Sequence, residues 1–183
     1  MIFGIGLSRT GGTSLTVALR KLGYRSYHHI DFRYLYFLVD NDLNLKYSYL
    51  EKFDAMIDLP AVLHYKELDK IFPDAKFILT IRKDKKKWLS SIKNLHKNVR
   101  PWLAVFPYVL AFDKQVWGQL EYDAKVYSKK YDSYVAEVKQ HFKGRKNKLL
   151  VIDITQGEGY EKLCPFLGLP TLNEKFPHKN KKI

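Results

Sequence analysis

The residues near the N-terminus that are best suited to chemistry form a glycine-rich loop. Gly6, Gly11 and Gly12 punctuate the stretch GLSRTGGTS, which follows a short apolar run and precedes a helical pattern. In a loop between a strand and a helix, backbone N–H groups converge on one point, and the helix N-terminus adds partial positive charge. The stretch therefore predicts an anion site with Arg9 as its cation, although an ordinary tight strand-to-helix turn has a similar pattern.

The spacing of this loop also matches the phosphate loop of nucleotide kinases, except at one position. Those kinases place Lys before the final Ser or Thr of the motif, and this chain has Gly12 there. Apart from Asp153, we expect no acidic residue near enough to help Thr13 hold magnesium. Both features argue against ATP chemistry, and a P-loop kinase of a small metabolite is kept as an alternative.

A second cluster, RKDKKKWLSS, begins at Arg82. Arg82 ends a predicted strand, and Ser90 follows eight residues later inside the next predicted helix. An arginine at a strand end and a serine on the following helix can hold one phosphate from two sides. We interpret the lysines from Lys83 to Lys87 mostly as a solvated surface, and Trp88 as a core residue rather than a partner for a nucleobase.

Strands that alternate with helices must position these residues. The apolar runs predict strands at 1–7, 24–28, 53–57, 75–81 and 149–154, and helical spacing predicts helices from Leu15 to Leu22 and at 61–72, 85–96, 119–142 and 160–167, with one or two more within 31–52. Such alternation is typical of a parallel sheet covered on both faces, and ligands bind at the carboxyl ends of its strands.

Composition limits the class of protein. The 183 residues fit one domain, and 46% hydrophobic residues exclude disorder. A single cysteine excludes a disulfide framework and suits the cytoplasm. No membrane span or signal peptide is expected. The net charge of +13 predicts an anionic partner, or simply a lysine-rich surface. No nucleic-acid-binding signature supports the alternative of a non-enzymatic nucleic-acid-binding module.

Three blocks together resemble the P-loop sulfotransferases, in particular small members with Gly-Leu-Pro-Arg-Thr-Gly-Thr near the start: FGIGLSRTGGTSL, FPDAKFILTIRKDKKKWLSS and LLVIDITQGEGYEKLCPFLGLPTLNEKFPH. The resemblance implies a three-layer α/β P-loop fold with a central parallel β-sheet flanked by helices, over residues 1–183 as one domain. It also implies 3′-phosphoadenosine 5′-phosphosulfate (PAPS) as the sulfuryl donor, the 3′,5′-bisphosphate PAP as product, no metal, and a small-molecule or glycan acceptor with a hydroxyl or amine.

The same resemblance assigns roles to residues. It implies that Arg82 and Ser90 hold the 3′-phosphate, and that the loop holds the 5′-phosphosulfate through Ser8, Arg9, Thr10, Gly11, Gly12, Thr13 and Ser14. Two departures stand out, because the family usually has Thr in place of Gly12 and Asp-Pro after Arg82. Neither departure removes a charge or a phosphate donor.

Transfer also needs a group that accepts the proton of the acceptor. His28 is our first choice for this base and Asp58 the second, with His29 and Asp31 as further candidates near the same sheet edge. Structural roles are open for both: a hydrogen-bonding histidine, and a cap for the helix that begins near Ala61. By analogy with phosphoryl transfer, Arg9 would stabilise the charge on the leaving phosphate.

The aromatic segments 31–52 and 99–142 are predicted to form the acceptor side, although their rings would serve equally well as core or as the face of a homodimer. A relative that binds the nucleotide without turnover is a further alternative. In the C-terminal tail, His178 and the lysines Lys179, Lys181 and Lys182 are candidates to approach the donor.

Overall fold

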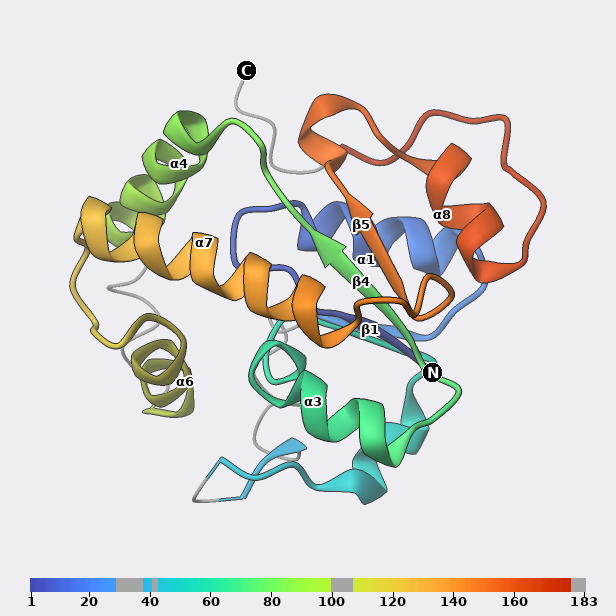
Figure 1. Ribbon diagram of the computed structural model, residues 1–183, viewed down its shortest axis with the longest axis horizontal. Coiled ribbons are helices and arrows are strands. Elements are labelled where there is room, and N and C mark those ends of the chain that lie inside the picture. Colours follow the sequence, from blue (N-terminus) through green and yellow to red (C-terminus); the bar gives the residue numbers. More distant parts are fainter. Residues whose placement is uncertain (29–37, 41–42, 100–106, 179–183) are drawn as a thin grey trace.

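Five parallel strands organise the part of the chain that the computed structural model describes, which is residues 1–28, 38–40, 43–99 and 107–178 (Figure 1). The strands lie in the order β2-β3-β1-β4-β5, and every neighbouring pair is parallel. Their bounds are β1 (Ile2–Gly4), β2 (Ser26–His28), β3 (Ala55–Ile57), β4 (Lys76–Thr80) and β5 (Leu149–Ile152).

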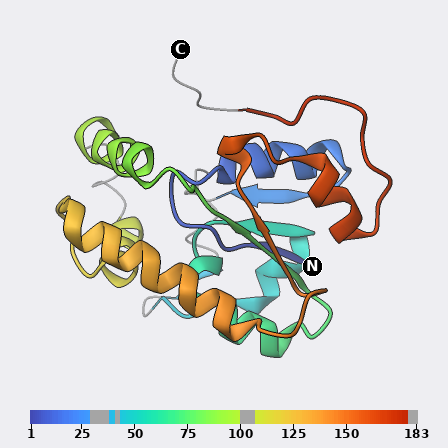
Figure 2. The same ribbon diagram turned by 45° about the horizontal axis from the view of Figure 1, so that its top comes forward.

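Helices cover both faces of the sheet. Figure 2 shows α1 (Gly12–Lys21) and α8 (Tyr160–Leu167) on one side, and α3 (Ala61–Ile71) and α7 (Ala124–His141) on the other. Packed beside α7 are α4 (Lys85–Asn98) and α6 (Pro107–Trp117). The described residues also form two short 3-10 helices, η1 (Tyr47–Lys52) and η2 (Ile154–Gln156). The structure thus confirms the three-layer α/β fold.

Alternation along the strands divides the core between the two faces. Ile2 of β1 and Ile78 of β4 join the cluster under α1 and α8, whereas Phe3 and Phe77 join the larger cluster under α3 and α7. All four side chains are at most 5% exposed. A strand buried on both faces is apolar throughout, which explains why the strands appear as apolar runs in the sequence.

Several predicted boundaries were wrong. The helix expected from residue 119 begins at Ala124, because the side chain of Asp123 accepts hydrogen bonds from Lys125 N and Val126 N and caps it there. The aromatic segment 99–142, which was predicted to be helical, contains α6, and residues 100–106 of this segment lie outside the described residues. Within 31–52, where one or two helices were predicted, the structure describes a helical residue at Leu38 and the helix η1, and residues 31–37 and 41–42 lie outside the described residues.

The sheet order brings the predicted chemistry to one edge. The glycine loop leaves the carboxyl end of β1, His28 ends β2, Asp58 follows β3, Arg82 follows β4, and Asp153 follows β5. Because β1 lies between β3 and β4, the glycine loop is flanked by the exits that carry Asp58 and Arg82. The candidate site therefore lies at the carboxyl edge of the sheet.

Candidate functional site

The glycine loop (Gly6–Ser14) is held against the end of β4 by close packing and a shared hydroxyl pair. A Cβ atom on Gly6 would lie 1.9 Å from Thr80 Oγ1, so only glycine fits there. Thr10 is fully buried; its Oγ1 donates to Leu7 O at 2.6 Å and lies 2.7 Å from Thr80 Oγ1. The side chain of Thr10 therefore fixes the shape of the loop through contacts within the protein.

The start of α1 presents the end of a helix to the loop. Gly11 adopts a left-handed conformation with φ of 116° at the N-cap and brings no side-chain cap. The first N–H groups of a helix have no intrahelical partner, and the helix dipole places partial positive charge there. The helix that starts at Gly12 is ten residues long, and no acidic residue lies in its first turn. This end of α1 favours an anion.

Two arginines meet beside this helix end. Arg9, in the left-handed region with φ of 69°, donates from Nε to Ser91 Oγ at 2.9 Å. Burial, followed by the nearby positive charge of Arg82, lowers the pKa of Arg9 below its ordinary value. Among the residues that the structure describes, no ion pair joins either arginine to a carboxylate. The carboxylate of Asp84 offsets part of the charge of Arg82 without forming an ion pair with it, and a bound anion would compensate the rest.

Ser91 is a contact that the sequence analysis missed. Ser90, the predicted partner of Arg82, is exposed on α4, whereas Ser91 is half-buried and holds the guanidinium of Arg9. Helical spacing could have predicted this contact: Ser91 lies three residues after Trp88, and residues three apart share a helix face. Trp88 is fully buried, which confirms it as a core residue.

His28 lies beside the first residue of α1. A Cβ atom on Gly12 would be 3.2 Å from His28 Nε2, so the ring occupies space that a larger residue at position 12 would contest. The histidine is 8% exposed. The family usually has Thr at position 12, and here glycine leaves room for the ring of His28 at the end of β2. The ring nitrogen lies at the N-terminus of α1, where we expect the anion.

Asp58 is the second candidate base, and its carboxylate is engaged by the backbone. The residue has φ of 72° and is 6% exposed, and its Oδ1 accepts a hydrogen bond from Leu59 N at 2.9 Å. Its own carbonyl accepts from Val62 N at 3.3 Å, and α3 begins at Ala61 with Pro60 as N-cap. Asp58 therefore contributes to the turn into α3 through its main chain. The other candidates, His29 and Asp31, lie outside the described residues.

Asp153 is committed to the backbone of the neighbouring loops. This fully buried carboxylate accepts from Lys83 N at 2.8 Å, and from the N–H and hydroxyl of Thr155 at 3.0 and 2.6 Å. It ties the exit of β4 to the exit of β5. Its hydrogen bonds support a structural role at the sheet edge instead of the magnesium role considered from the sequence.

Other predicted residues fall in different surroundings. Phe112 and Trp117 of the predicted acceptor side belong to the core, at 0% and 4% exposed. His178 is exposed. The lysines Lys179, Lys181 and Lys182 and much of the aromatic segments, residues 29–37, 41–42 and 100–106, lie outside the described residues.

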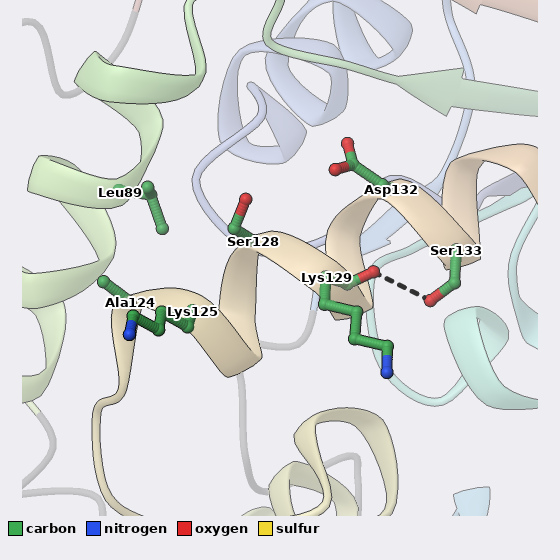
Figure 3. A pocket seen from close by; sticks show the side chains of 7 residues that line it. All are labelled: Leu89, Ala124, Lys125, Ser128, Lys129, Asp132 and Ser133. Carbon is green, nitrogen blue, oxygen red and sulfur yellow. Dashed lines mark hydrogen bonds between the residues drawn. The ribbon is translucent and has the colours of Figure 1, made fainter.

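A separate hollow lies between α4 and α7 (Figure 3). Leu89 comes from α4, and the rest of its lining comes from α7: Ala124, Lys125, Ser128, Lys129, Asp132 and Ser133. None of these residues belongs to the predicted donor site. The hollow is therefore not the place where the arginines and the glycine loop converge.

The described ranges contain neither a membrane-spanning helix nor a cluster of metal-ligating side chains. No helix there has the length and hydropathy needed to cross a bilayer. No group of three or more His, Cys, Asp or Glu side chains is arranged there to hold a metal ion.

Comparison with known proteins defines the class. A family model described as a sulfotransferase domain matches residues 1–183, the whole chain, so this protein belongs to the sulfotransferase domain family. It is also similar to the "Ava biosynthesis cluster protein M" of Aspergillus versicolor, with 27% identity over 208 aligned positions that cover 95% of this chain and 78% of the fungal protein. The family membership confirms the resemblance and identifies sulfotransfer as its general chemistry.

Proposed function

We propose that this protein transfers a sulfuryl group from PAPS to a hydroxyl or amine of a small-molecule or glycan acceptor. The observation that carries the proposal is the proximity of Arg9 and Arg82 at the carboxyl edge of the sheet, where α1 begins, with no ion pair to a carboxylate among the described residues. Paired, half-buried guanidinium groups at a helix N-terminus suit a ligand with several negative charges.

The division of this charge between two loops supports PAPS over ATP. PAPS has anionic groups on two sides of its ribose, a 5′-phosphosulfate and a 3′-phosphate, whereas ATP carries its phosphates in one chain. In the proposal, Arg9 and the amides of the glycine loop hold the 5′ group, with Ser91 orienting the Arg9 side chain. Arg82 and Ser90 hold the 3′-phosphate, and the two loops are adjacent because β1 and β4 pair.

The transfer step is an in-line displacement at sulfur. The bond between sulfur and the bridging oxygen of the donor breaks while a bond forms from sulfur to the acceptor oxygen or nitrogen. His28 Nε2, placed beside Gly12, takes the proton of the acceptor. Arg9 and the helix end stabilise the negative charge that appears on the leaving phosphate. We place this reaction in the cytoplasm, where the buried thiol of Cys164 stays free.

Calorimetric titration with PAP tests the proposal directly. We expect PAP to bind with micromolar affinity, and magnesium-ATP and a random oligonucleotide to bind far more weakly. A preference for magnesium-ATP would support a kinase despite Gly12. Binding of the oligonucleotide alone would show that the surface charge, and not the glycine loop, is the functional feature. A screen of acceptors with radiolabelled PAPS then follows the first outcome.

A further inference from the structure

We propose that Tyr131 is a positioning residue that holds Arg82 for recognition of the 3′-phosphate, and that it does so through the main chain of Arg82. This inference rests on the proposed function and extends it to a residue on α7 that neither the sequence motifs nor the family comparison indicates.

The hydroxyl of Tyr131 bonds both main-chain polar groups of Arg82. It accepts a hydrogen bond from Arg82 N at 2.8 Å and lies 3.2 Å from Arg82 O, to which it donates. The last sheet hydrogen bond on this strand runs from Ile81 N to Ile152 O, so Arg82 has just left the sheet ladder. Buried backbone groups need hydrogen-bond partners, and Tyr131 on α7 supplies them for Arg82, which no longer pairs with a neighbouring strand.

The ring of Tyr131 is itself fixed by the glycine loop. Its centroid lies 4.4 Å from that of Trp88, and the indole Nε1 of Trp88 donates to Ser8 O at 3.1 Å. Tyr131 is 6% exposed and Trp88 is fully buried. A single aromatic pair therefore contacts both anion-binding loops, one through Ser8 and the other through Arg82, and sets the separation between them.

The chemistry of the hydroxyl suits this role. Burial is the main cause that raises the pKa of Tyr131 above its ordinary value, so the hydroxyl keeps its proton and can donate and accept together. Phenylalanine would preserve the ring packing against Trp88 and remove both contacts to Arg82. Tyr131→Phe is therefore a narrow test of the hydroxyl.

The experiment compares two ligands that differ by one phosphate: PAP, and AMP, which lacks the 3′-phosphate. In calorimetric titrations, we expect Tyr131→Phe to weaken PAP binding by about tenfold, the usual value of a hydrogen bond near 1.4 kcal/mol, with AMP binding changed by less than about twofold. Tyr122→Phe is the matched control, since its hydroxyl donates to Leu89 O at 3.3 Å and touches neither anion loop. We expect that variant to bind both ligands like the wild-type protein.

A double-mutant cycle separates positioning from general stability. In an Arg82→Ala background, Tyr131→Phe should have no further effect on PAP affinity, because the residue acts through Arg82. Additive losses in the cycle would overturn the proposal. If wild-type protein itself failed to prefer PAP over AMP, the donor assignment would fail. A preference for PAP over AMP that is as large in folded Tyr131→Phe as in the wild-type protein would overturn the role of Tyr131 alone.

Hydrogen exchange on wild-type protein gives a test that needs no variant to fold. We expect the Arg82 amide to exchange much more slowly than the amide of an open loop, since Tyr131 accepts its hydrogen bond. Exchange at the rate of an open loop would contradict the proposed contact.

Discussion

Arg9 and Arg82 bring two positive charges together at the carboxyl edge of the sheet, and the free protein bears their repulsion. Burial is the main cause that lowers the pKa of Arg9, and the positive charge of Arg82 lowers it further. A bound polyanion would compensate the charges of both arginines, so their electrostatic repulsion in the free protein would contribute to the affinity for such a ligand. The two residues should nevertheless differ in function, since Arg9 lies in the glycine loop, which we propose to hold the 5′ group, and Arg82 follows β4.

Alanine at each position is expected to separate binding from turnover. Arg82→Ala should weaken PAP binding by about 100-fold, as expected when a charged hydrogen-bonding partner is lost. Arg9→Ala should mainly lower kcat, by about 100-fold, because it stabilises the leaving group. Titration and steady-state kinetics measure the two effects. Arg25→Ala, which removes an exposed ion pair with Asp54 at the opposite sheet edge, is the control. Normal PAP binding by Arg82→Ala would remove it from the 3′-phosphate site.

His28 provides a third prediction at this scale. His28→Ala should lower kcat by about 100-fold or more, the usual contribution of a general base, with PAP affinity unchanged. His64→Ala, on α3 and hydrogen-bonded to Leu43 O, should have no such effect on kcat. A His28→Ala variant with full turnover would transfer the role of base to Asp58 or to His29.

At the scale of elements, α7 extends from the candidate site, where Tyr131 contacts Arg82, to Asp69 on α3, which His141 contacts. Near its middle, Tyr134 donates to Ile5 O at 2.8 Å, directly before the glycine loop. At its far end, His141 Nε2 lies 2.9 Å from Asp69 Oδ2 on α3, and Arg145 Nη1 donates to the same oxygen at 2.7 Å. The placement of α7 therefore affects the loop that it supports.

Asp69→Asn should destabilise the fold by about 2 kcal/mol at neutral pH, the usual value of charge-assisted hydrogen bonds to a buried group. The Asp69 side chain is 6% exposed. Burial raises its pKa, but Arg145 and His141 outweigh that effect, and the net pKa lies below its ordinary value.

The direction of that shift defines the pH dependence. A lowered folded-state pKa means that the stabilisation is complete above the unfolded value of about 4 and is lost as pH falls through the folded value. Denaturant unfolding from pH 7 to pH 3 should therefore show the gap between wild-type protein and Asp69→Asn closing with acid. Asp74→Asn, an exposed neighbour, serves as control. A constant gap would contradict the ionic role.

For the whole molecule, the distribution of charge matters more than its total. Residues 82–148 contain 17 Lys and Arg against six Asp and Glu, a net of +11 out of the +13 of the chain. This span begins at Arg82 and contains α4, α6 and α7. Exposed lysines without an ion pair in the described structure include Lys93 and Lys97 on α4, and Lys125 and Lys129 on α7.

Such a concentration of positive charge in α4, α6 and α7 should steer a polyanionic ligand toward the site. We expect stopped-flow association of PAP to slow as salt rises from low ionic strength. Replacing Lys93 and Lys97 together by glutamine should slow association by about two- to tenfold at low salt, with dissociation nearly unchanged. Replacing Lys70 and Lys175, which lie outside the span, removes the same net charge and should have a smaller effect. Equal effects of the two pairs would mean that net charge alone matters.

Local sequence patterns were enough to predict several elements of this protein. The glycine loop, the apolar strand β4, the helix after Arg82 and the buried Trp88 were all predicted correctly, because loop chemistry, apolar runs and helical spacing are properties of neighbouring residues. The same patterns also supported the family resemblance that the family comparison confirms.

Contacts between distant segments were decided only by the tertiary structure. The sequence order of the strands does not specify that β1 pairs with β4, and this pairing brings Arg9 near Arg82, 73 positions apart. In the same way, Ser91 reaches Arg9 across 82 positions, and Tyr131 reaches Arg82 across 49. A residue's type and its neighbours set what chemistry it can do, whereas the packing of helices on the sheet sets which partner it meets, because that packing depends on the whole core at once.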